Sequence, residues 1–333
     1  MLEQQNRTLA RLLLWGALPL LAACAGASTA PSIPDQLPPA AIGSLKPGPH
    51  FQGCPFFNGG APYANGVRSA PLDPNSANYI SSLIQAGDTS GFYASTGVEQ
   101  INLANNQTPL LTVHPKSSHK FPVPYPWQPY FFIEPLSDHH SMVVQTDSCY
   151  LYEAYSTSYA SGQLSAYSGA NWALKTKYVP LAPGNPSAMA SGLPMFAGMV
   201  TYDDYQSGSI AHALNWDGVA HTVSQYGFVW PASDTDRLSF DGSSNYQLPY
   251  GARLRLKASF STSGWGPQAT MVANAMKNFG VYLCDTGSSG NGIYFANGEN
   301  GSNPWNSSDL RSLGQITIGD FDVLQLPPIQ KDH

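Results

Sequence analysis

Charged residues are scarce in this chain of 333 residues, and several common functional motifs are missing. Only 11% of the residues are Asp, Glu, Lys or Arg, and the formal net charge is −6. No cluster of Lys and Arg occurs, which argues against nucleic acid as a partner. The sequence also contains no Gly-x-Ser-x-Gly elbow, Walker loop or dinucleotide fingerprint. The enzyme classes that depend on those motifs are therefore not expected.

Cysteine and long apolar runs are also scarce. The chain has four cysteines, and none of them lies in a Cys-x-x-Cys motif or a Cys/His cluster. A metal site built from cysteines is therefore not expected. The one marked apolar run, residues 12–21, is about half of the roughly 20 residues that a membrane-spanning helix needs. No later segment is long and apolar enough to span a membrane.

The N-terminal residues have the parts of an export signal. Arg7 and Arg11 precede the apolar run, which ends in Leu21-Ala22-Ala23-Cys24. A basic start, an apolar core and small residues at the end are typical of a secretory signal. The last four residues resemble the bacterial lipobox, which implies cleavage before Cys24 and diacylglycerol on its thiol. The alternative is an ordinary signal peptide with a chance cysteine. Ala25, by the sorting rule of Gram-negative lipoproteins, favours the outer membrane.

The rest of the chain divides into a tether and one domain. Residues 24–50 are rich in Ala, Pro, Ser and Gly, a composition that cannot bury enough apolar surface to fold. Residues 51–333 are long enough for one large domain or two small ones, and no repeat or mid-chain linker divides them. We therefore expect a signal peptide at 1–23, a lipid-anchored tether at 24–50 and a single extracytoplasmic domain at 51–333.

Strand-like segments dominate the expected domain. Residues 253–258 alternate polar and apolar side chains, as a half-buried strand does. Two helices are expected, at 75–85 and at 267–279; the second has Pro near its start and Gly after its end. Many short strands with few helices predict a mainly β fold, an antiparallel β-sandwich or jelly-roll-like single domain. Strands are expected at 110–114, 130–134, 141–145, 149–155, 198–202, 210–215, 226–230, 253–260 and 280–284.

Several motifs together resemble a family of secreted, functionally uncharacterised proteins from bacteria and some fungi. They are Asp-Pro-Asn-Ser-Ala-Asn-Tyr-Ile at 73–80, Ser-Asp-His-His at 137–140, Cys-Tyr-Leu-Tyr-Glu at 149–153, Gly-Ser-Ile-Ala-His-Ala-Leu at 208–214, Val-Trp-Pro-Ala at 229–232 and Leu-Pro-Tyr-Gly-Ala-Arg-Leu-Arg-Leu-Lys-Ala at 248–258. The residues alone allow one disulfide among the three remaining cysteines without choosing it. The resemblance implies that Cys54 pairs with Cys149. It also implies that Cys284, where relatives have a small residue, is reduced and buried.

A short motif, Asp285-Thr286-Gly287-Ser288, resembles the signature of aspartic proteases. That chemistry needs two aspartates that share a proton, and the sequence has no second copy of the motif. Relatives in the resembling family carry Asp-Asn-Gly-Ser at this place, which breaks the protease pattern. The sequence therefore favours a turn after a strand, with an aspartic-type protease as an alternative.

Two histidines and a glutamate form a first candidate site. His139 and His140 precede an expected strand, and alternation places their side chains on opposite faces. One histidine is therefore expected to face a cleft and the other to face solvent or core. Glu153 lies on the next strand, across an expected tight turn at Asp147-Ser148. A histidine beside a carboxylate can act as a general base, and the alternative is a hydrogen-bonded structural pair.

His212 is the centre of a second candidate site. It shares a strand face with Ile210 and Leu214, which favours a core histidine with a satisfied hydrogen bond. The alternative is a pocket shared with Asp203 or Asp204 from the end of the preceding strand. Carboxylates and a histidine could act on a glycosidic bond or bind Ca²⁺. No other cofactor is expected.

Tryptophans interspersed with Asn, Gly and Ser indicate a sugar-binding surface. Aromatic faces flanked by amides are used by sugar-binding clefts, and Trp216 and Trp230 are the residues expected to bind substrate. The first hypothesis is a surface lipoprotein that cleaves or binds extracellular polysaccharide, with His139, His140, Glu153, Asp203 and His212 as its candidate catalytic residues. The alternative is a non-catalytic structural or adhesive envelope protein. The sequence leaves open whether the chain is an enzyme.

Overall fold

The computed structural model describes most of the chain beyond residue 49. Within Leu37–His333, the described residues belong to one compact unit. The expected signal peptide, Cys24 and nearly all of the tether lie outside the described residues. Among the described helices, none combines the length and the apolar character that a membrane span requires. The described residues are 50–57, 62–121, 123–237, 245–287, 290–298 and 301–331.

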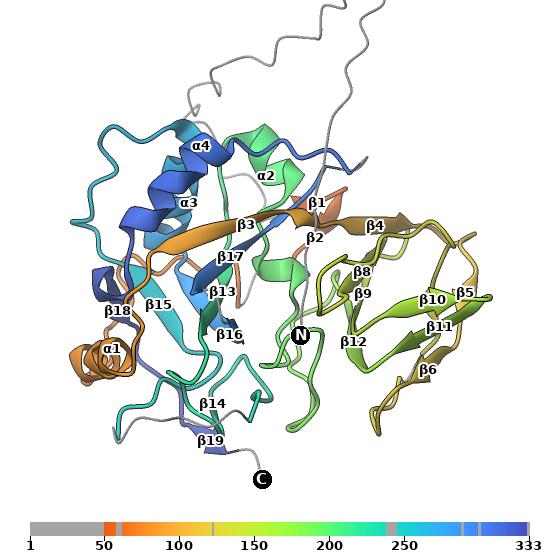
Figure 1. Ribbon diagram of the computed structural model, residues 1–333, viewed down its shortest axis with the longest axis horizontal. Coiled ribbons are helices and arrows are strands. Elements are labelled where there is room, and N and C mark those ends of the chain that lie inside the picture. The colour runs from red at the N-terminus through yellow and green to blue at the C-terminus, as the bar shows by residue number, and fades with distance from the viewer. Residues whose placement is uncertain are drawn as a thin grey trace, which may run out of the picture. The chain divides into compact units, whose positions relative to one another are not determined.

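The predicted mainly β fold is confirmed, because strands in several sheets outnumber a few short helices. The sheets are mixed, and several neighbouring strands run parallel, such as β13 with β16 and β3 with β17. The largest sheet has six strands (Figure 1). In sheet order they are β18 (Phe321–Val323), β15 (Arg253–Leu256), β16 (Val281–Gly287), β13 (Leu214–Val219), β17 (Asn291–Ala296) and β3 (Phe92–Glu99).

A second sheet of four strands separates two apolar clusters. Met142 and Leu151 belong to the main core together with Trp216, whereas Val143 and Tyr152 belong to a smaller cluster. Because successive strand residues point to opposite faces, a sheet covered on both faces has buried residues throughout its strands. In sheet order the strands are β12 (Ser168–Ala173), β9 (Tyr150–Tyr155), β8 (Ser141–Gln145) and β4 (Ile101–Ala104).

The remaining strands form small sheets. A three-stranded sheet lies beside the smaller cluster, because Leu164 and Val113 pair in it and are buried there. Its strands are β10 (Ser158–Ala160), β11 (Gln163–Ala166) and β6 (Val113–Pro115). The two-stranded sheets are β1 (His50–Phe51) with β2 (Cys54–Pro55), β5 (Leu110–Leu111) with β7 (Tyr125–Pro126), and β14 (Gly227–Phe228) with β19 (Gln330–Lys331).

Both predicted helices are present. The long helix α3 has Pro at its first turn and buries Met271, Val272 and Met276, so its apolar face is core as the spacing indicates. In Figure 1 it lies with α4 near the six-stranded sheet. The α-helices are α1 (Ser76–Gln85), α2 (Tyr202–Ser207), α3 (Pro267–Asn278) and α4 (Ser307–Leu310), and the 3₁₀ helices are η1 (Phe196–Gly198), η2 (Arg311–Gln315) and η3 (Ile318–Asp320).

Two predicted strands are wrong, and a third, 210–215, is a strand only from Leu214 on, so His212 does not lie in a strand. Residues 130–134 are irregular, and their backbone is held by the side chain of Asn102, which accepts from Phe132 N at 2.7 Å and donates to Phe132 O at 2.9 Å. Residues 198–202 instead join η1 to α2. Thr201 caps α2, since its hydroxyl accepts from Asp204 N while the Asp204 carboxylate accepts from Thr201 N. That reciprocal capping box starts a helix where apolar residues suggested a strand.

The disulfide and the free thiol agree with the prediction. Cys54 is bonded to Cys149, and Cys284 is free and buried. Cys149 ends the four-residue turn 146–149 between β8 and β9 and has a positive φ of 55°. The disulfide thus fastens the β1–β2 hairpin to one end of the four-stranded sheet.

Candidate active site

A cavity of about 980 Å³ lies against the six-stranded sheet. Side chains from β3, β13, β16 and β17 line it, and loops from the four-stranded sheet and from residues 184–190 complete the wall. Two aspartates on neighbouring strands line it, Asp217 of β13 and Asp285 of β16. Both are partly exposed in the cavity.

A β-bulge brings the two aspartates together. Trp216 pairs with Leu283 in the parallel ladder, but Asp217 pairs with Asp285, so Cys284 is the extra residue on β16. Without this shift Asp217 would pair with Cys284, and Asp285 would pair with the residue after Asp217. Bulges often re-aim side chains beside functional sites. Here the bulge sets two carboxylates side by side on adjacent strands.

The two carboxylates have different hydrogen-bond partners. Asp285 Oδ2 accepts from Ala190 N at 2.9 Å, and its Oδ1 accepts from Thr286 N at 2.8 Å. Asp217 Oδ2 accepts from the Tyr294 hydroxyl, and its Oδ1 accepts from the Cys284 thiol at 3.7 Å. Asp285 is therefore held by two backbone amides, which favour an ionised carboxylate.

Burial raises the pKa of both aspartates, and the charge of a neighbouring carboxylate adds to it in each case, Asp285 for Asp217 and Asp236 for Asp285. Desolvation and the charge of Asp285 raise the pKa of Asp217 to about 8. Desolvation raises the pKa of Asp285 to about 6, and its two backbone amides hold it below that of its neighbour. The pair titrates jointly, and near neutral pH its favoured form is a protonated Asp217 beside an ionised Asp285.

Two tyrosines, from β3 and β17, lie near Asp217. Gly292 of β17 pairs with Asp217 on one side and with Tyr93 of β3 on the other. A Cβ at Gly292 would lie 2.9 Å from the Tyr93 hydroxyl and 3.1 Å from Cζ, so the Tyr93 ring lies across this glycine. Tyr294 lies two residues along the same strand and donates to Asp217. The missing side chain at Gly292 thus lets Tyr93 extend over the sheet toward the aspartates.

A second acidic group lines the same cavity. The His140 Nδ1 atom lies 3.5 Å from Glu99 Oε1 and 3.7 Å from Glu134 Oε2, and all three residues are buried. Burial alone would lower the pKa of His140, but the carboxylates of Glu99 and Glu134 outweigh it and raise the pKa to about 9. Burial raises the pKa of Glu99, and His140 partly offsets that effect.

The first predicted site is only partly assembled. His140 lines the cavity, whereas His139 is exposed and its Nδ1 donates to Glu134 O at 3.1 Å. Glu153 pairs with Met142 and is fully buried. Its carboxylate accepts from the backbone amides of Met195 at 2.9 Å and Phe196 at 2.8 Å, where η1 begins. The expected pairing of Glu153 with a histidine is therefore wrong, because the free amides of a helix start take its oxygens.

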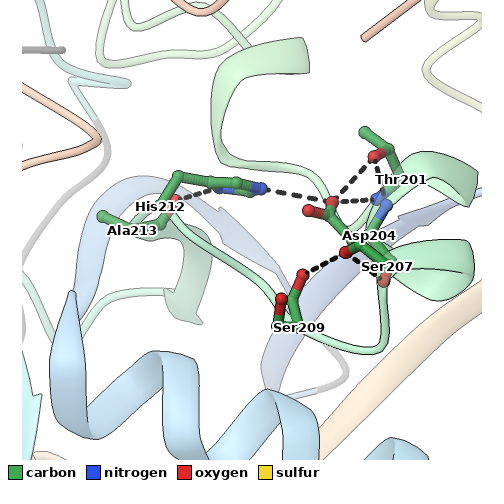
Figure 2. A network of polar contacts seen from close by, with 6 residues as sticks. All are labelled: Thr201, Asp204, Ser207, Ser209, His212 and Ala213. Atoms are coloured by element: carbon green, nitrogen blue, oxygen red, sulfur yellow. Dashed lines mark hydrogen bonds and ion pairs between the residues drawn. The ribbon is translucent and has the colours of Figure 1, made fainter. Parts of the chain in front are cut away.

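The second predicted site is a closed network (Figure 2). His212 Nε2 lies 3.3 Å from Asp204 Oδ2, and its Nδ1 donates to Ala213 O at 2.8 Å. His212 is 0% exposed and Asp204 is 8% exposed. The partner is Asp204, whereas Asp203 accepts from Gln52 N at 3.0 Å. Both aspartates belong to α2 and not to a strand end, so His212 is a core histidine with satisfied hydrogen bonds.

Within the described part of the chain, no tryptophan lines the cavity. Trp216 is 0% exposed and donates from Nε1 to Asn291 Oδ1 at 2.8 Å, so the expectation that it binds substrate is wrong. Trp230 is 43% exposed but is not among the described residues that line the cavity. The aromatic rings of the wall belong instead to tyrosines, namely Tyr93, Tyr155, Tyr167 and Tyr294.

Sequence reasoning missed half of the aspartate pair. Asp285 was visible as part of a protease-like motif, but Asp217 lies in Trp-Asp-Gly, which matches no catalytic motif. The bulge that joins them has no sequence signal, and Glu99 lies 41 residues before its partner His140. An aspartate in the middle of an apolar strand was the one available clue.

Similarity to other proteins adds nothing to this geometry. Comparisons of the chain with models of protein families, with curated proteins and with solved structures found no match. The resemblance to a secreted family therefore stays an interpretation of the motifs. Function has to be inferred from the cavity.

Proposed function

We propose that the protein is a surface-anchored hydrolase of extracellular polysaccharide whose catalytic residues are Asp217 and Asp285. The observation that carries the proposal is the placement of these two carboxylates, side by side in an open cavity and with unequal raised pKa values. Cleavage of a glycosidic bond needs one carboxylic acid and one carboxylate. The pair offers both near neutral pH.

The proposed reaction assigns one role to each aspartate. Asp217 gives its proton to the glycosidic oxygen while the bond from that oxygen to the anomeric carbon breaks. The Asp285 carboxylate attacks the anomeric carbon and forms a glycosyl ester. Water then cleaves the ester as ionised Asp217 takes one of its protons, which restores both residues. Asp217 and Asp285 are directly paired on neighbouring strands, and a pair of close carboxyls is the arrangement of enzymes that retain the anomeric configuration.

The cavity wall favours a neutral or amino-bearing sugar. Carboxylates outnumber cationic side chains, so uronic acids, sulfate esters and phosphates would be repelled. Tyrosine rings offer apolar faces for sugar rings, and hydroxyls offer hydrogen bonds at their edges. The acidic residues of the wall are Glu99, Glu134, Asp138, Asp217, Asp234, Asp236 and Asp285, and the basic ones are His119, Lys120, His140 and Arg237.

The proposed location rests on the N-terminal sequence. The lipobox-like motif at Cys24 would anchor the protein by lipid outside the cytoplasm, on the outer membrane by the sorting rule. The Cys54–Cys149 disulfide supports this location, because disulfides persist in oxidising compartments. Mass spectrometry of the mature N-terminus tests it: an acylated Cys24 supports the anchor, and an intact leader or an unmodified thiol overturns it.

The proposed activity is tested on a panel of neutral, amino-bearing and acidic polysaccharides. The full chain in detergent should release new reducing ends from members of the first two groups. Asp217→Asn and Asp285→Asn should release none, and Asp147→Asn, which changes an exposed aspartate in the β8–β9 turn, should act like the wild type. Binding without product release by the wild type would favour a non-catalytic adhesive protein instead.

A peptidase is a second candidate because the structure gives Asp285 a neighbouring aspartate. Two aspartates that share a proton can activate water against a peptide bond. A transition-state mimic of aspartic proteases separates the two proposals. Inhibited cleavage of an unfolded protein would favour a peptidase, and inertness toward peptides with sugar release would favour the glycosidase.

A further inference from the structure

The acidic group of Glu99, Glu134 and His140 is a separate feature of the cavity wall. Glu99 ends β3, while Glu134 and His140 lie at the two ends of the loop that precedes β8. One carboxylate oxygen from each glutamate and one ring nitrogen of His140 all lie within 4.8 Å of one another. The Asp217–Asp285 pair contributes no atom to this group.

The distances inside the group are longer than those of typical charge-assisted hydrogen bonds. His140 Nδ1 lies 3.5 Å from Glu99 Oε1 and 3.7 Å from Glu134 Oε2. Charge-assisted hydrogen bonds from nitrogen to oxygen are about 2.7–2.9 Å long. Ligand atoms that share a metal ion at about 2.1–2.4 Å are instead roughly 3.0–3.9 Å apart at ordinary coordination angles. Both measured distances fall in that range.

Glu99 and His140 are buried and face each other at a distance that is long for a charged pair. The Glu99 side chain is 4% exposed, and His140 lies 3.5 Å from its carboxylate. The His140 side chain is 7% exposed, and its Nδ1 points into the group without a close hydrogen bond. Buried charges are normally paired at close range or bound to a metal ion. A cation between these atoms would give Glu99 and the His140 ring a close partner, while Glu134 also accepts from Leu136 N and His140 N at 3.1 Å each.

We propose that Glu99, Glu134 and His140 bind one divalent cation. Two carboxylates would neutralise its charge, and an imidazole beside carboxylates suits Zn²⁺ or Mn²⁺ better than Ca²⁺. All three residues also line the cavity, so the remaining coordination positions would face water or a bound ligand. This site goes beyond the proposed hydrolysis and does not depend on it.

The site is tested by titrating the chelator-treated full chain in detergent. Mn²⁺ binding is followed by loss of the free-ion electron paramagnetic resonance signal, and Zn²⁺ and Ca²⁺ binding by calorimetry. We expect one equivalent of Mn²⁺ or Zn²⁺ per chain and weaker binding of Ca²⁺. Glu99→Gln and Glu134→Gln should each weaken binding by at least the ~10–100-fold that loss of an outer partner of a metal ligand costs.

A matched control separates a built site from general attraction to an acidic cavity. Asp138 lies in the same wall but outside the group, so Asp138→Asn removes one negative charge and should leave the affinity within about twofold. X-ray absorption of the Zn²⁺-loaded wild type gives a readout without any variant. One imidazole with oxygen ligands in the first shell is the expected spectrum.

Two results would overturn the metal site. One is a wild type that binds neither Mn²⁺ nor Zn²⁺ below millimolar concentration, and the other is a Glu99→Gln variant that binds like the wild type. Asp285→Asn keeps this test apart from the test of hydrolysis. The Asp285→Asn variant should no longer release sugar but should still bind one equivalent of metal. Either proposal can therefore fail while the other stands.

Discussion

Two groups in this protein are built around aspartates: a closed group of Asp204 and His212 inside the protein, and an open group of Asp217 and Asp285 at the cavity wall. Asp204 accepts from Thr201 N at 2.8 Å and Thr201 Oγ1 at 2.7 Å, and it lies 3.3 Å from His212 Nε2, all inside the protein. Asp217 faces Asp285 at the wall of an open cavity, where burial raises both pKa values and the charge of Asp285 further raises that of Asp217. The closed group has its hydrogen bonds satisfied and stabilises the fold. The open group keeps two like-charged carboxyls together, which lowers stability but leaves them available for chemistry.

The largest effect is expected from the open group. Asp285→Asn removes the proposed nucleophile and should lower the rate of reducing-end release by about 10⁴-fold. The variant should remain folded, because an amide oxygen can still accept from Ala190 N or Thr286 N and the repulsion with Asp217 disappears. Circular dichroism and a glycan-release assay measure the two properties.

An Asp285→Asn variant that keeps its activity would contradict the catalytic role of the open group. Loss of the fold in this variant would contradict that role too, because the pair would then be structural like Asp204 and His212. Asp147→Asn serves as the control for handling and expression.

The closed group should show the reverse pattern. Removing the imidazole in His212→Ala leaves the buried Asp204 carboxyl without one partner and opens a cavity in the core. We expect the free energy of unfolding to fall by about 3 kcal/mol. The turnover number of the folded fraction should stay within about twofold of the wild type, since the imidazole touches no cavity residue of the proposed mechanism.

Urea denaturation with a parallel glycan-release assay checks this prediction. A large fall in turnover with unchanged stability would move His212 from the fold to the active site. Asp203→Asn is a suitable control, because it changes the adjacent aspartate on α2, which is not the partner of His212.

A pH series should sharpen the contrast between the two groups. Activity requires ionised Asp285 and protonated Asp217, so it should be highest between pH about 6 and about 8 and fall on both sides. Both folded-state pKa values lie above the ~3.9 of an unfolded aspartate, so the folded chain binds more protons in between. The free energy of unfolding should therefore fall as the pH rises through this range, and less so in Asp217→Asn.

The measurements are the pH–rate profile and urea midpoints at several pH values. A flat profile across this range, or stability that falls equally in the wild type and Asp217→Asn, would show that the pair does not titrate as proposed.

The smallest effect is expected at the edge of the open group. A methyl group in Gly292→Ala would meet the Tyr93 ring and push it from its place beside the aspartates. We expect kcat/KM to fall by about tenfold through misplaced substrate. In the double variant with Tyr93→Ala, the change at Gly292 should have no further effect, because the clash is gone. Additive losses would contradict this account.

Local sequence patterns predicted much of the fold. Alternation identified β15, where Leu254 and Leu256 are buried and the arginines between them are partly exposed. Pro267 and Gly280 identified the start and end of α3. Patterns failed where distant groups decide the local structure, as at residues 130–134, which the Asn102 side chain holds out of regular strand pairing.

The candidate site was predicted less well, because it is assembled by sheet register. His140 was recognised from its own sequence, but its partner Glu99 comes from β3, and nothing in the sequence singled out Glu134 in the same loop. The bulge that pairs Asp217 with Asp285 depends on how β13 and β16 align, and no residue pattern encodes it. The disulfide, in contrast, followed from the resemblance to secreted proteins and not from spacing.

The most direct test of the central claim is covalent trapping. An activated fluorosugar of the type that the chain cleaves should form a stable ester with its nucleophile, and mass spectrometry of peptides then locates the sugar. We predict that the label lies on Asp285, and that neither Asp285→Asn nor the unfolded chain is labelled. Turnover of the glycan with a label on another residue, or with no label at all, would contradict the account.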